Sequence, residues 1–97
     1  MRYFVVEIHP QARPTAWLKP MTEDEICIQL NVLSIENARA VMARKGIGFL
    51  MVPEGSVESE IARLRKGSGK EPANPAAADA LHYAHMNFIG SAAPADA

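Results

Sequence analysis

Side chains that can exchange protons occur in two stretches of the sequence that alternate like β-strands. Glu7 and His9 lie on one side of Arg2–His9, and Tyr83 and His85 share one side of a later stretch. A carboxylate can orient a histidine base, and a tyrosine can act as an acid. If the two strands were neighbours, these four side chains would line a pocket on a semi-polar sheet face. A solvated or dimer-packed sheet face explains the same residues without chemistry.

Other motifs that could carry chemistry are incomplete. His82 and His85 have no Cys pair, HExxH motif or carboxylate cluster to complete a metal shell. Cys27 lies between isoleucines, an apolar setting that does not activate a thiol. Gly67–Lys70 lacks the Ser or Thr of a phosphate loop, and Gly46–Gly48 follows a predicted helix instead of preceding one. The sequence therefore predicts no metal site, no catalytic cysteine and no cofactor.

A proline-rich stretch offers a different kind of site. Residues 10–21 hold three prolines together with Trp17, Leu18 and Met21. Loops of this length are uncommon without a purpose. Trp17 either covers an edge of the core or anchors a partner from an exposed position. We take Trp17, Leu18 and Met21 as the predicted partner-binding residues.

Basic residues gather where two predicted helices end. They form one candidate basic patch, namely Arg44, Lys45, Arg63, Arg65 and Lys66. Cations in the last turn of a helix offset its macrodipole, which explains them without a ligand. If both helix ends met at one edge, they would suit RNA or an acidic surface. A net charge of −1 argues against nucleic acid.

The hydrophobic pattern predicts two helices and several short strands. The helices are Ile35–Lys45, capped by Ser34 and stopped by Gly46, and a second one from about Ser56 to Lys66. Thr22 to Glu25 resembles a capping box. The alternation that follows nevertheless favours a strand, so the predicted strands are Arg2–His9, Glu25–Leu33 and Gly48–Val52.

The last part of the chain supports two interpretations. A helix from Asn74 to Gly90 would place Ala77, Leu81, Ala84 and Phe88 on one face. Alternation from Leu81 onward instead favours a helical turn at Pro75–Ala80 followed by a strand at Leu81–Ile89. We adopt the second interpretation and keep the first as its alternative.

These elements predict an α+β fold in two layers. The predicted order is strand, strand, helix, strand, helix and a fourth strand, ferredoxin-like in outline, with both helices on one sheet face. The second and third strands would be parallel, joined by a right-handed crossover. The 97 residues suit a single domain over residues 1–90 with a flexible tail at residues 91–97.

Composition predicts that the protein is cytoplasmic. No apolar run approaches the roughly 20 residues that span a bilayer, no signal sequence is visible, and a single cysteine suits a reducing compartment. We therefore expect no membrane association. A chain of this size would gain stability from association with another copy, as a homodimer.

The absence of a complete catalytic motif predicts a non-enzymatic protein-interaction module. Such a module would act as an adaptor or inhibitor, of the kind that phages and mobile elements also encode. It would bind a protein partner through its open sheet face or its Pro/Trp loop. The alternatives are a dimeric small-molecule enzyme or ligand-binding protein that uses the polar sheet face, and a module that binds RNA or an acidic surface through the basic helix ends.

Overall fold

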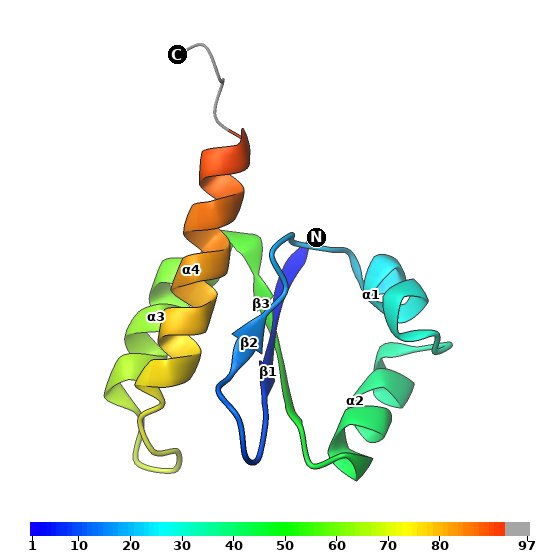
Figure 1. Ribbon diagram of the computed structural model, residues 1–97, viewed down its shortest axis with the longest axis horizontal. Helices are drawn as coiled ribbons and strands as arrows, with labels where there is room; N and C mark the ends of the chain where they lie inside the picture. Colours follow the sequence, from blue (N-terminus) through cyan, green and yellow to red (C-terminus); the bar gives the residue numbers. More distant parts are fainter. Residues whose placement is uncertain (93–97) are drawn as a thin grey trace.

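The computed structural model describes residues 1–92 and shows a mixed α+β fold with one antiparallel sheet (Figure 1). Its strands stand in the order β2-β1-β3 and are β1 (Tyr3–Ile8), β2 (Thr15–Ala16) and β3 (Gly48–Pro53). Its α-helices are α1 (Glu23–Leu30), α2 (Ile35–Arg44), α3 (Val57–Lys66) and α4 (Pro75–Ala92). A short 3₁₀ turn, η1 (Glu54–Ser56), links β3 to α3.

The central strand β1 is buried from both sides. Phe4, Val5 and Val6 are each fully buried. Phe4 and Val6 pack in one cluster with α3 and α4, whereas Val5 packs in a second cluster with α1 and α2. Figure 1 shows these helix pairs on opposite sides of the sheet. The prediction that both helices share one face was wrong, because consecutive apolar residues on β1 give both faces something to bury.

Several local predictions are confirmed. The expected strands at Arg2–His9 and Gly48–Val52 correspond to β1 and β3, and the two expected helices correspond to α2 and α3. The Ser34 hydroxyl accepts the backbone N–H of Asn37 at 3.1 Å and begins α2. Gly46, just beyond α2, has a φ of 74°, a left-handed conformation that glycine adopts without steric cost.

The strand predicted at Glu25–Leu33 was wrong, because residues 23–30 form α1. The Thr22 hydroxyl accepts the backbone N–H of Glu25 at 3.2 Å, and the Glu25 carboxylate accepts the Thr22 N–H at 2.9 Å. This reciprocal capping box satisfies donors that a strand would have to pair elsewhere. Ile26 is buried and Ile28 is exposed. A strand would place both isoleucines on the same face, whereas the helix buries one and exposes the other, so the alternation was misleading.

The strand predicted at Leu81–Ile89 was also wrong, because α4 is one continuous helix past Gly90. The Asn74 side chain accepts the Ala77 N–H at 3.1 Å and caps its start. The face proposed for the helical alternative is the buried one, with Ala77, Leu81 and Ala84 at 0% exposure. The small alanines on this face let the helix pack closely against the sheet.

These two helices change the topology as well as the count of strands. Residues 25–33, directly before α2, do not form a strand, so there is no parallel crossover and no ferredoxin-like order within residues 1–92. β3 instead runs antiparallel to β1, with Val6 opposite Leu50. Of the expected tail, residues 91–92 belong to α4, and residues 93–97 lie outside the part of the chain described here.

Candidate functional site

The three predicted partner-binding residues come together around a shallow hollow beside α1. Trp17, Leu18 and Met21 all line this space, which has a volume of about 500 Å³. Its remaining walls come from β1, from the loop and from the end of α1, namely Glu7, Lys19, Gln29 and Leu30. The loop therefore forms the site together with a helix that the sequence pattern had predicted as a strand.

Trp17 is a wall of this hollow and also part of the core. Its indole N–H donates to a Glu7 carboxylate oxygen at 2.6 Å, and its backbone N–H donates to the Val5 carbonyl at 2.9 Å. The side chain packs with the cluster that covers Val5. Met21 is tied down similarly, because its backbone pairs with Tyr3 in an isolated β-bridge. These contacts fix the positions of Trp17 and Met21 in the wall of the hollow.

Leu18 differs from its two neighbours because its side chain is open to solvent. It is 46% exposed, and it lines a second hollow of about 630 Å³ on its other side. That hollow lies between the loop and α4, and its walls are Arg13, Pro14, Thr15, Ala16, Pro75, Ala76, Asp79, Ala80 and Tyr83. Leu18 thus forms an apolar ridge between two open depressions.

Cationic side chains stand at the rims of both hollows. Arg13 lines the larger hollow and Lys19 the smaller one, and neither forms an ion pair within residues 1–92. Asp79, the acidic residue of the larger hollow, pairs with Arg65 at 2.9 Å. The Glu7 carboxylate already accepts the Trp17 N–H and lies 3.4 Å from His9. The charges left to attract a ligand are therefore positive.

The four residues of the enzyme alternative do not share a pocket. Glu7 and His9 are neighbours, and His9 Nε2 also lies 3.3 Å from the Thr15 hydroxyl. His85 instead packs edge-on against Phe4 on the α3/α4 side of the sheet, at a ring separation of 5.7 Å. Tyr83 lies on the exposed side of α4. The sheet separates Glu7 and His9 from His85, so the structure brings the Glu7–His9 pair together but not the set of four.

The predicted basic residues are divided between two places. α2 and α3 both end at the lower end of the molecule in Figure 1, with the sheet between them. Hydrogen bonds from Arg63 to Glu60 and Glu71 raise the pKa of the Arg63 guanidinium, and Arg65 pairs with Asp79. Two of the five cations are thus already partnered. The remaining three are Arg44, Lys45 and Lys66.

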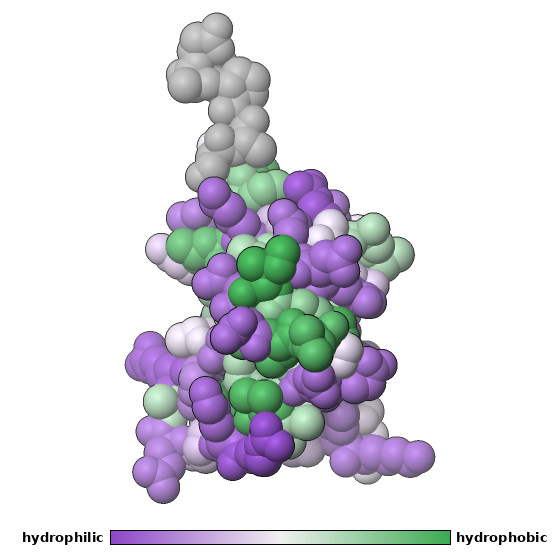
Figure 2. Space-filling view, turned by 90° about the vertical axis from the view of Figure 1, so that its right-hand side faces the viewer, coloured by the Kyte–Doolittle hydropathy of each residue, from purple (hydrophilic) through white to green (hydrophobic). Residues whose placement is uncertain are grey.

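A separate apolar patch lies on the outer face of α1 and α2. Figure 2 shows hydrophobic side chains in the middle of this face with hydrophilic ones around them. The large exposed hydrophobic residues of these elements and their connection are Ile28, at 78% exposure, and Leu33, at 95%. Leu33 is an exposed leucine that lines neither of the two Leu18 hollows, which makes it a matched control for substitutions there.

Metal sites and membrane-spanning helices require features that residues 1–92 do not have. No group of three His, Cys, Asp or Glu side chains there is placed to hold a metal ion. No helix in the same range is long and apolar enough to cross a membrane.

The smaller hollow includes residues that sequence reasoning did not select. Gln29 and Leu30 line it because α1 carries them toward the loop. The signal that could have found them was the capping box at Thr22, together with Asn31, which ends α1 with a φ of 57°. Comparison with known proteins gave no matching family model, no matching curated protein and no matching solved structure.

Proposed function

We propose that this protein is a small protein-binding module that captures a short segment of a partner protein across the ridge formed by Leu18. The observation that carries the proposal is that one exposed leucine lines two adjacent hollows. Helices cover both faces of the sheet, so the Pro/Trp loop and not the sheet face is the docking element.

The dimensions of the hollows suit side chains of a peptide. Volumes of about 500 and 630 Å³ lie in the range of small-ligand sites, and the walls are mostly apolar with a few polar groups at the rim. A bound segment would place one apolar side chain on each side of Leu18. Because Trp17 and Met21 are held by hydrogen bonds to β1 and its bridge, the receiving surface is preorganised.

The rim charges select among such segments. Arg13 and Lys19 have no ion pair within residues 1–92, whereas the acidic groups Glu7 and Asp79 are already engaged. A carboxylate on the bound segment would therefore meet a cation on either side of the ridge. The proposed partner segment carries two apolar side chains flanked by at least one Asp or Glu.

A peptide-display selection on the purified chain tests this proposal. The expected result is a consensus with two apolar positions and an acidic one. A synthetic consensus peptide should bind the Leu18→Ser variant about fivefold or more weakly, because truncation of a side chain that anchors an interface costs over about 1 kcal/mol. Leu33→Ser is the matched control and should bind normally.

Leu18 is a better target for this test than Trp17, because Trp17→Ala would also remove part of the core. The proposal fails if no consensus emerges, or if the consensus peptide binds Leu18→Ser as tightly as it binds the unmodified chain. An Arg13→Gln/Lys19→Gln double variant tests the charge requirement. It should weaken peptide binding most at low salt.

A further inference from the structure

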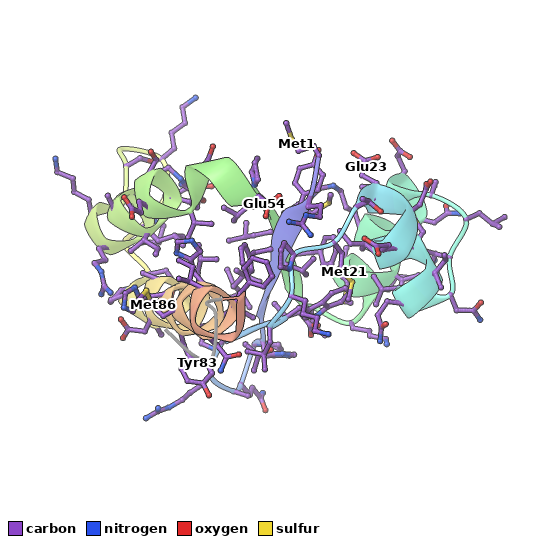
Figure 3. The ribbon with its side chains drawn as sticks, turned by 90° about the horizontal axis from the view of Figure 1, so that it is seen from above. Met1, Met21, Glu23, Glu54, Tyr83 and Met86 are labelled. Carbon is purple, nitrogen blue, oxygen red and sulfur yellow. The ribbon has the colours of Figure 1, made fainter. Side chains whose placement is uncertain are left out.

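The outer side of α4 presents large apolar side chains that nothing within residues 1–92 covers. Tyr83 is 64% exposed, Met86 51% and Ile89 46%. Figure 3 shows Met86 projecting from α4 away from the sheet, whereas Tyr83 lies on the side of α4 that lines the larger hollow. The opposite side of the same helix already packs against β1 through Leu81 and Ala84. α4 is therefore apolar on two sides, unlike a helix that serves only to cover a core.

Beyond Asp79, which pairs with Arg65, the exposed side of α4 also lacks formal charge. From Ala80 to Ala92 the sequence contains no Asp, Glu, Lys or Arg. α3, which is also half in solvent, carries both acidic and basic residues along its exposed face, namely Glu58, Glu60, Arg63, Arg65 and Lys66. Charge depletion together with tyrosine and methionine is the composition of an interface core.

We infer that α4 packs antiparallel against α4 of a second copy of this chain. Tyr83, Met86 and Ile89 are evenly spaced, with Met86 in the middle. A two-fold axis at Met86 would place the two Met86 side chains together and would place each Tyr83 opposite the second copy's Ile89. Such an interface is self-complementary, as two-fold symmetry requires.

The charge pattern is the reason to choose a second copy as the occupant. A face without formal charge meets an identical face with no like-charge repulsion, whereas most other surfaces would bring charges that find no partner. Gly90 has open space around its α-carbon and would oppose His82 of the second copy. The contact thus has room for its bulkier side chains.

The size of the face predicts a reversible dimer. With about 200 Å² for a whole large side chain, the three residues expose on the order of 300 Å². A stable interface buries about 800 Å² per partner. We therefore expect the 10.5 kDa chain to be monomeric when dilute and to approach twice that mass at high micromolar concentrations.

Sedimentation equilibrium over about 5 to 500 µM protein tests the inference. Met86→Glu places two carboxylates at the symmetry axis and should weaken dimerisation by at least about tenfold. Leu33→Glu adds the same charge to an exposed leucine elsewhere and should dimerise normally. A monomer at every concentration overturns the inference, and so does a dimer that Leu33→Glu disrupts while Met86→Glu leaves it intact.

Cross-linking provides a second measurement that depends on geometry instead of affinity. In a Cys27→Ser background, Met86→Cys should form a disulfide-linked dimer under a mild oxidant such as copper phenanthroline, because the two residues meet at the axis. Leu33→Cys in the same background should remain uncross-linked. Equal cross-linking of the two variants contradicts the proposed axis.

Self-association and peptide binding are separable. Tyr83 lines the larger hollow as well as the α4 face, so neither test alters it. Leu18→Ser should lose the consensus peptide yet dimerise normally. Met86→Glu should lose the dimer yet fold with an unchanged circular dichroism spectrum.

Discussion

At the scale of single residues, the contact between Trp17 and Glu7 links the loop to the sheet. The indole N–H donates to a half-buried carboxylate at 2.6 Å, and the same carboxylate lies 3.4 Å from His9. A hydrogen bond to a charged acceptor is worth more than a neutral one. This contact holds the wall of the smaller hollow, so the geometry of the site and the stability of the fold depend on the same atoms.

We expect Trp17→Phe to lower the free energy of unfolding by about 1–2 kcal/mol, because the Glu7 carboxylate loses a donor while the aromatic volume is largely kept. Urea denaturation followed by circular dichroism measures the change. Glu7→Gln is the matched variant and should cost less, since its amide oxygen still accepts the indole N–H. A Trp17→Phe variant as stable as the unmodified chain would show that the hydrogen bond contributes nothing.

At the scale of elements, α1 shows how a short local signal outweighs a longer pattern. The alternation over residues 25–33 suits a strand, but the capping box at Thr22 satisfies two backbone donors at once. Three acidic residues in the first turn favour the same end of a helix through its macrodipole. Only Ile26 of α1 is fully buried, so terminal interactions carry a large share of what defines this helix.

The capping box makes the stability of α1 depend on pH. Hydrogen bonds from the Thr22 backbone and side chain lower the pKa of Glu25 below its ordinary value of 4.5. A lowered pKa in the folded state means that the stabilisation is present above pH 4.5 and is lost as the pH falls through the folded-state pKa. Glu25→Gln should therefore be less stable than the unmodified chain at pH 7, and the gap should shrink below pH 4.5.

Thermal unfolding measured across this pH range tests the prediction. Glu23→Gln lies in the same turn but outside the capping box, so it should show only the smaller effect of the macrodipole. A gap between Glu25→Gln and the unmodified chain that stays constant into acid would contradict a role for the titrating carboxylate.

At the scale of the whole molecule, two helix pairs share one thin sheet. Phe4 faces α3 and α4, its neighbour Val5 faces α1 and α2, and both side chains are fully buried. Neither helix pair has another surface to pack on within residues 1–92. We therefore expect the domain to unfold as a single cooperative unit.

Ala84→Leu tests this cooperativity, because it overfills the packed alanine side of α4 and should cost about 1–3 kcal/mol. Trp17, the single tryptophan, reports on the opposite face of the sheet. Its fluorescence and the helical circular dichroism signal should shift together. Ala40→Leu, at an exposed position of α2, should move neither by more than about 0.5 kcal/mol. Transitions that separate would mean that the two helix pairs unfold independently.

The sequence predicted a helix or strand correctly where its local signals agreed. For α2, the N-cap Ser34, the helical spacing and the Gly46 stop all indicated one element, and the structure has it. For residues 81–89, helical and alternating patterns were both present, and the choice of a strand was wrong. The apolar residues of this segment fit either pattern, because Leu81, Ala84 and Phe88 share a helical face while Ala84, Met86 and Phe88 also alternate.

The candidate site was predictable only in part for a related reason. The composition of residues 10–21 indicated Trp17, Leu18 and Met21, and the structure brings these three together. Their individual exposure depends on what packs against the loop. Three further wall residues, Gln29, Leu30 and Tyr83, belong to segments that had been predicted as strands.

The sequence by itself determined the elements whose caps, stops and periodicity agree, because these are interactions between residues close along the chain. Only the tertiary structure decided that α4 is one continuous helix, that both faces of the sheet are covered, and that Leu18 stays open while Trp17 is held. Burial is a property of pairs of distant segments. A pattern compatible with two periods is settled by whichever form covers the most apolar surface.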